Sequence, residues 1–338
     1  YLLLQSGMRL EVEEMQEKVI CWLGILPLFT QEQMLLKREI KKDYLMSYNT
    51  YITFTSWEER FLKSFEKDTS ENNFEKIILL SFDNAHHKEK QQVFINEIQV
   101  SKPSVEIIYL TFSDDIKIWK QLKNELFTNE SNNFGKVLLN ISTMPRNIIY
   151  YLLHFLDSEN IQYTSIYYKA LVHSERLTEN PLKPSLILQH SGIFELEKPT
   201  LLIACVGYDE KRVFQLYNHF EPKEVILLME TEHKSKVNLD TKFDFSLIPN
   251  HIVEDISSFI PHDIYKKLEI IYNQKASTYN ILLCSLGPKL STMEFFKFQK
   301  VHIECGLIYI GSKDYCKDYS SGIDLDNPIL VPYNYFGN

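Results

Sequence analysis

Four short segments combine small or hydroxyl-bearing residues with a nearby cation, which is the chemistry needed to hold an anion. They read TSWEER, ISTMPR, VGYDEKR and SLGPK, and each follows an apolar run and enters a stretch of helical periodicity. Backbone amides at a helix N-terminus, hydroxyl groups and cations together bind phosphate. The residues expected to bind a ligand in this way are Thr55, Ser56, Arg60, Ser142, Thr143, Arg146, Gly207, Arg212, Ser285, Gly287 and Lys289.

A purely structural explanation of these turns stays open. Proline favours the first turn of a helix and acidic residues favour its N-terminus, so Pro-Arg, Pro-Lys and the nearby acids could simply mark helix starts. Both kinds of turn recur in both halves of the chain. That recurrence favours ligand binding.

Catalysis by the acids of these turns is the weaker interpretation. Glu58, Glu59, Asp209 and Glu210 could act as general acid or base, or hold a divalent metal. Beside arginines they are equally well explained as salt-bridge partners.

Sequence motifs for cofactor chemistry are missing. The chain has no GxGxxG after a strand, no Walker GxxxxGK[ST], no HExxH and no GxSxG. His86 and His87 lie in a polar loop with no third ligand at a recognisable spacing, which favours a solvated loop over a metal site. We therefore expect neither a cofactor nor a metal.

The elements that position the turns are strands and helices in alternation. The runs IILLSF, VLLNI, TLLIACV, VILLM and NILLC are almost continuously apolar, as in parallel strands buried on both faces. Helical stretches between them predict βαβ units with right-handed crossovers. The expected fold class is α/β, built from Rossmann-like doubly wound parallel sheets. Ligands of such sheets bind beyond the carboxyl ends of the strands, where these turns lie.

The pattern occurs twice, in residues 53–169 and 200–318. The offset between matching segments falls from about 150 to about 140 residues, as expected for copies that lost loop residues at different places. Two unrelated α/β halves are the alternative. Tyr167, Tyr168 and Tyr309 end the late strands, and we favour core packing for them over stacking on a base.

Four regions are predicted along the chain: an N-terminal helical segment (1–49), a first Rossmann-like domain (50–172), a linker (173–199) and a second Rossmann-like domain (200–338). The C-terminal tail is expected to be extended and to pack on the second domain. Met8 could be the true initiator, which would make residues 1–7 foreign to the protein.

Composition excludes several classes of protein. A net charge of −9 over 338 residues argues against a broad nucleic-acid-binding face. Five cysteines without CxxC spacing are typical of reduced thiols in the cytoplasm. No stretch reaches the roughly 18 apolar residues of a membrane span, and the N-terminus does not resemble a signal peptide. We expect a cytoplasmic protein without membrane contact.

The segments NISTMPR and CSLGP resemble the ligand loops of the CRISPR-associated Rossmann-fold (CARF) sensors. Two such units in one chain resemble the related cyclic-oligonucleotide sensors of bacterial antiphage systems. The usual Gly-Gly-Thr turn differs here, since ISTMPR has no glycine and SLGPK has one. The resemblance implies an oligonucleotide second messenger bound between the two units, and an effector protein as partner because this chain contains no recognisable effector.

Two alternatives of other classes remain from the residues alone. A nucleotide-processing hydrolase or phosphodiesterase could use the strand-end carboxylates in the same cleft. A structural platform for protein partners could use the many aromatic residues, which include 20 tyrosines and 21 phenylalanines.

Overall fold

The computed structural model describes residues 47–83, 87–112, 114–128, 133–174, 177–207, 211–231 and 245–333. The helical segment predicted at the N-terminus (1–49) falls almost wholly on residues outside these ranges. Within them, no helix has both the length and the apolar character that crossing a bilayer requires.

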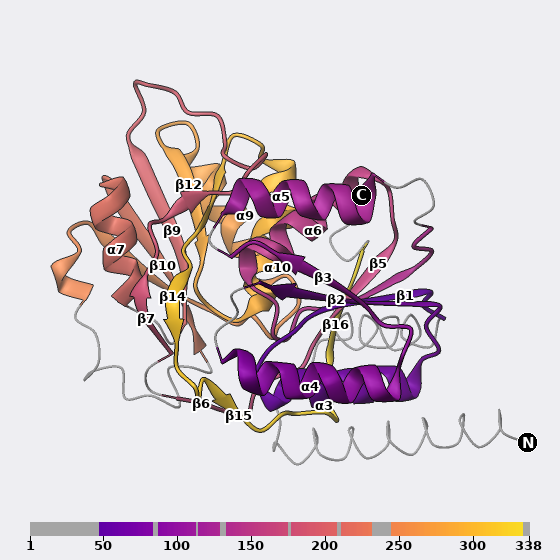
Figure 1. The fold of residues 1–338 in the computed structure, drawn as a ribbon. Helices are drawn as coiled ribbons and strands as arrows, with labels where there is room; N and C mark the ends of the chain where they lie inside the picture. The colour runs from indigo at the N-terminus through magenta and orange to yellow at the C-terminus, as the bar shows by residue number, and fades with distance from the viewer. Residues whose placement is uncertain are drawn as a thin grey trace, which may run out of the picture. The chain divides into compact units, whose positions relative to one another are not determined.

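The first sheet has six strands in the order β16-β5-β4-β1-β2-β3. Its strands are β1 (Thr50–Phe54), β2 (Lys76–Phe82), β3 (Glu106–Leu110), β4 (Val137–Asn140), β5 (Tyr163–Tyr167) and β16 (Ile329–Pro332). Helices α3 (Glu59–Glu71) and α4 (Lys88–Ser101) cover one face, and α5 (Asp115–Leu122) with its π-helical extension (Lys123–Phe127) and α6 (Arg146–Ser158) cover the other (Figure 1).

The second sheet has the order β11-β10-β9-β12-β13-β8. Its strands are β9 (Thr200–Val206), β10 (Glu224–Glu230), β11 (His251–Ile256), β12 (Asn280–Ser285), β13 (Gly306–Tyr309) and β8 (Ser185–Leu186). Its helical elements are α7 (Lys211–Phe220), the short 3-10 turn Phe245–Leu247, α9 (Asp263–Lys275) and α10 (Lys289–Val301).

The two sheets have matching topology, which confirms the predicted fold class. In each, a first strand (β1 or β9) pairs in parallel with the second and the fourth. In each, an antiparallel strand closes the edge beside the fifth. The continuous apolar runs are the central strands, since β9 and β12 are buried along almost their whole length. Strand order reverses between β1 and β4 and between β9 and β12, so ligand crevices are expected there.

The third strand of each sheet was not predicted. Tyr109 in β3 is 50% exposed, and Ile252 and Val253 in β11 are each 43% exposed. Both strands lie at sheet edges and are only partly buried. An edge strand therefore lacks the continuous apolar run by which the central strands were recognised.

The chain leaves each sheet in an arm that crosses to the other half. The first arm follows β5 and contains β6 (Val172–His173), β7 (Thr178–Pro181) and β8; the second follows β13 and contains β14 (Ser312–Tyr315), β15 (Ser320–Ser321) and β16. The arms pair with each other as β7–β14 and β6–β15. The first arm then ends as β8 beside β13, and the second ends as β16 beside β5.

This exchange corrects one expectation. The described part of the tail, β16, pairs with β5 of the first sheet rather than packing on the second domain. An open sheet edge presents unpaired backbone groups that any strand can satisfy, so local sequence does not determine which edge the tail joins.

Helices α6 and α10, which follow equivalent strands, pack against each other between the sheets (Figure 1). The rings of Tyr150 and Phe296 lie 6.4 Å apart across this contact, and Asp157 pairs with Lys297 at 3.3 Å and Lys300 at 2.5 Å. One hydrophobic cluster contains buried residues of both halves. The two Rossmann-like units therefore share a core.

Candidate functional site

The carboxyl ends of β1, β4, β9 and β12 meet at one cavity of about 180 Å³. Nine of the eleven predicted ligand-binding residues line it. They are Thr55, Ser56, Arg60, Thr143, Arg146, Gly207, Arg212, Gly287 and Lys289. The fold thus brings turns of both halves to a single cavity. Parallel-sheet topology accounts for the pairing of turns within each sheet.

Two predicted residues do not line the cavity. The Ser142 hydroxyl accepts a hydrogen bond from the backbone amide of Tyr168 at 2.9 Å. The Ser285 hydroxyl lies 2.6 Å from that of Ser291 and 3.0 Å from that of Thr292. Both hydroxyls support the turns from within.

Of the four acids weighed as catalysts, Glu58 lines the cavity. Glu59 lies 62% exposed on α3 and pairs with Lys63 at 3.1 Å, away from the cavity. Asp209 and Glu210 lie outside the described residues. Within the described ranges, no group of three His, Cys, Asp or Glu side chains gathers as metal ligands.

The cavity is cationic although the whole chain is acidic. Five cations line it against two carboxylates, those of Glu58 and Glu230. The cations are Arg60, Arg146, Lys169, Arg212 and Lys289. A cavity with charges of mainly one sign and low-dielectric walls concentrates its field, so it attracts anions despite a net charge of −9.

The first pair of cations occupies equivalent positions in the two halves. Arg60 donates to the carbonyl of Tyr168 at 3.3 Å, and Arg212 donates to the carbonyl of Ile310 at 2.6 Å. Each carbonyl follows the last parallel strand of its own sheet. Both arginines are buried, with 3% and 7% exposure, so their positions are set by the fold.

The second pair crosses between the halves. Arg146, at the start of α6, donates to the carbonyl of Gly287, and Lys289, at the start of α10, donates to the carbonyl of Ser142 at 2.8 Å. A side chain on Gly287 would collide with Cys205, because its Cβ would lie 2.5 Å from the sulfur. Glycine here allows the turn to approach that strand closely.

Two of these arginines retain unused donors. The Nε atoms of Arg60 and Arg146 are buried and have no hydrogen-bond partner among the described residues. A buried donor without an acceptor costs about 1–3 kcal/mol. A ligand oxygen in the cavity would supply acceptors of the required kind.

Charges in the cavity perturb each other. Loss of water, then repulsion by Arg60 and Arg146, holds the pKa of Lys289 well below its usual value. Burial opposes ionisation of Glu58, but Arg60, Lys289 and the Ser320 hydroxyl together lower its pKa below normal. Loss of water and then Arg60 lower the pKa of His173 to about 4. At neutral pH, Glu58 is ionised and His173 is neutral.

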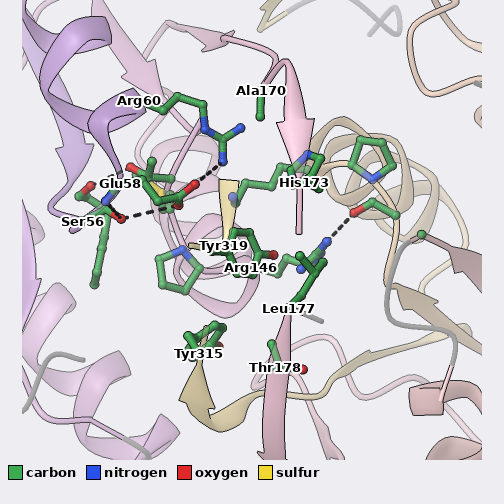
Figure 2. Close-up of a pocket in the computed structure, with 18 of the residues that line it drawn as sticks. Ser56, Glu58, Arg60, Arg146, Ala170, His173, Leu177, Thr178, Tyr315 and Tyr319 are labelled. Atoms are coloured by element: carbon green, nitrogen blue, oxygen red, sulfur yellow. Dashed lines mark hydrogen bonds and ion pairs between the residues drawn. The ribbon is translucent and has the colours of Figure 1, made fainter. Parts of the chain in front are cut away.

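Aromatic side chains form much of the remaining wall, and Figure 2 shows those of Tyr315 and Tyr319 beside the cations. Tyr167 and Tyr309 also line the cavity, whereas Tyr168 is fully buried and donates to Asp68 at 2.6 Å. Core packing, the favoured interpretation of the three tyrosines, therefore describes Tyr168 best.

Several lining residues were missed by the sequence analysis. His173 and Thr178 come from the first arm, and Tyr315 and Tyr319 from the second (Figure 2). Lys169 follows β5, and its ammonium lies 4.1 Å from the ring centre of Phe259. The arms lack strong periodicity, so no local signal placed them at the site.

No family model matches the chain, and no curated protein is similar to it in sequence. Among solved structures, it is similar to a Type III CRISPR defence DNA nuclease activated by cyclic oligoadenylate, with 10% identity and a TM-score of 0.48 over 74% of this chain and 64% of that chain. This chain therefore spans less than two thirds of that nuclease.

Two further structures match less closely. The cytoplasmic domain of a prokaryotic cation chloride cotransporter gives 9% identity and a TM-score of 0.28 over 79% of this chain and 96% of that one. UDP-GlcNAc 2-epimerase from Neisseria meningitidis gives 9% identity and a TM-score of 0.25 over 76% and 93%. The chain itself is an α/β protein of two tandem Rossmann-like units with a cation-lined cavity where they meet.

Proposed function

We propose that this chain is the ligand-sensing subunit of a cytoplasmic bacterial antiphage defence system, and that it binds a nucleotide or cyclic oligonucleotide in the cavity between its two halves. One observation carries the proposal: equivalent strand-end turns of both halves direct cations into a single cavity that aromatic rings also line.

The cations suit the phosphates of such a ligand. A hydrogen bond to a charged group contributes about 1.5–3 kcal/mol, and micromolar affinity needs about 8 kcal/mol. The four strand-end cations, Arg60, Arg146, Arg212 and Lys289, are enough for that affinity. Their positions in equivalent pairs favour a ligand with anionic groups on two sides.

The rings suit the bases. Stacking of a base on an aromatic side chain contributes about 1–3 kcal/mol and requires no particular base. Trp57, Tyr315 and Tyr319 line the cavity beside the cations. A nucleotide offers both kinds of group, whereas inorganic phosphate or a simple sugar phosphate offers only one.

The ion pair and the lowered pKa of Glu58 favour ligand sensing over catalysis. Its carboxylate pairs with Arg60 at 3.1 Å and also accepts from the Ser320 hydroxyl. A carboxylate with a lowered pKa is a weak general base, and its partners hold it in place. The effector of the system would then be a partner protein.

Calorimetric titration with cyclic oligoadenylates, cyclic dinucleotides, linear oligoadenylates and nucleoside triphosphates tests the proposal. We expect micromolar or tighter binding of at least one of them, and an affinity loss of about tenfold or more in Arg146→Ala. Lys63→Ala is the matched control, because Lys63 lies 48% exposed on α3, away from the cavity. Mass spectrometry of small molecules released from protein purified after phage challenge would identify the natural ligand.

Two results would overturn the proposal. One is the absence of binding by the whole panel together with no released nucleotide. The other is binding that Arg146→Ala leaves unchanged while the variant unfolds at the temperature of the wild type.

A further inference from the structure

The arms that cross between the halves are fastened at the same arginines that line the cavity. Arg212 in the second half donates to the Thr178 hydroxyl at 2.9 Å. Thr178 is the first residue of β7, in the first arm. The arm leaving the first sheet is therefore held by the strand-end arginine of the second sheet.

The other half repeats this arrangement with one added group. Ser320, the first residue of β15 in the second arm, donates to the Glu58 carboxylate. Glu58 in turn pairs with Arg60 at 3.1 Å (Figure 2). Strands β7 and β15 are equivalent in the two arms, since the exchange pairs β7 with β14 and β15 with β6.

Further contacts hold the second arm to the first half. The indole of Trp57 donates to the carbonyl of Lys317 at 3.0 Å, and the His87 ring lies at hydrogen-bond distance from the carbonyl of Tyr315, also 3.0 Å. Both residues flank the strand-end loops of the first sheet. The arm is therefore fastened along the rim of the cavity.

An anionic ligand competes directly with these fastenings. Arg60 and Arg212 line the cavity, yet one amino group of each is engaged in holding an arm. An anion beside Arg60 would be repelled by the Glu58 carboxylate, and this repulsion is strong in a cavity of low dielectric. A buried carboxylate that loses its counter-ion is left with an uncompensated desolvation penalty, so Glu58 would move toward water.

From this geometry we infer that the two arms are a ligand-released strap: an anionic ligand takes Arg60 and Arg212 from Glu58 and Thr178 and thereby frees β6, β7, β14 and β15. The inference rests on the proposed function and adds how ligand binding in the cavity would change the structure outside it. Because the arms end as β8 and β16 on the opposite sheets, their release is transmitted to both sheet edges. Those edges and the freed strand pairs β7–β14 and β6–β15 then form the surface that a partner protein would recognise.

Hydrogen exchange of the full chain, with and without cyclic tetraadenylate or inorganic tripolyphosphate, tests the strap. We expect amides of residues 172–174, 177–180 and 312–321 to exchange at least about tenfold faster in the bound protein. Ser320→Ala should give the same acceleration around β15 and β6 without ligand, and should bind each probe about threefold or more tightly than the wild type. Ser321→Ala, the neighbouring exposed serine, is the matched control and should behave as the wild type.

The outcomes separate the two proposals. If either probe binds but the arms exchange at an unchanged or slower rate, the strap is wrong and the binding function stands. If Ser320→Ala shows the same amide exchange rates and the same affinity for each probe as Ser321→Ala, the hydrogen bond from Ser320 to Glu58 does not hold the arm, and the strap is wrong. If neither probe binds wild-type protein, the strap falls together with oligoadenylate sensing.

Discussion

Replacing Lys289 by methionine is expected to stabilise the free protein and weaken ligand binding at the same time. Lys289 is withdrawn from water near two other cations, Arg60 and Arg146, which holds its pKa well below the usual value. Its ammonium donates a hydrogen bond of 2.8 Å to the carbonyl of Ser142. Methionine has a similar length and no charge, so it fills the same space without the electrostatic cost.

The magnitudes follow from these contacts. Exchanging buried ionic groups for apolar ones of similar volume stabilises by up to about 1–4 kcal/mol, and the lost hydrogen bond costs about 1 kcal/mol. We expect a net gain of about 1–2 kcal/mol, with a rise in melting temperature of about 2–4 °C for each kcal/mol. Loss of a charged hydrogen bond to the ligand should weaken binding by about 10- to 150-fold.

The pH dependence identifies the cause. A lysine whose pKa is lowered by folding costs stability wherever the unfolded chain would keep it protonated, which is below pH about 10.4. The advantage of Lys289→Met should therefore be largest at neutral and acidic pH and vanish as the pH approaches that value. In the wild type, a bound anion favours the protonated form of Lys289, so binding should weaken at any pH where the free protein loses this proton.

Thermal unfolding followed by circular dichroism, and calorimetric titration across pH, measure both effects. Lys63→Met is the matched control, because Lys63 is a half-exposed lysine on α3, and its free energy of unfolding should stay within about 0.5 kcal/mol of the wild type. A Lys289→Met protein that melts lower than the wild type, or that keeps full ligand affinity, would refute the reasoning.

Three further predictions concern single residues. Glu59→Gln should change neither binding nor any nucleotide turnover, because Glu59 faces solvent beside Lys63; a turnover assay that loses its signal would revive the hydrolase alternative. Burial raises the pKa of Asp68 to about 7, so as the pH rises from about 4 to 7 its contribution to wild-type stability should fall by about 1.4 kcal/mol per pH unit, and urea unfolding of Asp68→Asn should lack this contribution. Gly192→Ala should cost more than about 2 kcal/mol, because φ is +79° and a Cβ would lie 2.6 Å from the carbonyl of Glu304; an unchanged denaturant midpoint would contradict this.

The sequence was sufficient for the parts of the fold that are encoded in local patterns. Continuous apolar runs mark strands buried on both faces, and β2, β4, β9, β10 and β12 all contain such runs. Parallel topology then requires that the turns after β1 and β4 lie side by side, and likewise those after β9 and β12. This is why the cations at positions 60, 146, 212 and 289 could be expected at the carboxyl ends of the strands, where all four line the cavity.

Side-chain direction within those turns depended on the exact start of each helix. Glu58 precedes α3 and faces the cavity, whereas Glu59, one residue later, is the first residue of α3 and faces solvent. Successive residues of a helix point about 100° apart, so a shift of one position separates a buried ion pair from an exposed one. Spacing alone did not distinguish the two.

Only the tertiary structure decided how the halves meet. Packing of α6 on α10 sets the two sheets around one cavity, and the crossed arms carry Tyr315, Tyr319 and Thr178 to its wall. The α6–α10 contact and the pairing of the arms join residues more than a hundred positions apart, and the short arm strands have backbone partners in the other half rather than in their own. Local periodicity encodes which face of an element is buried, but not which distant edge or helix will bury it.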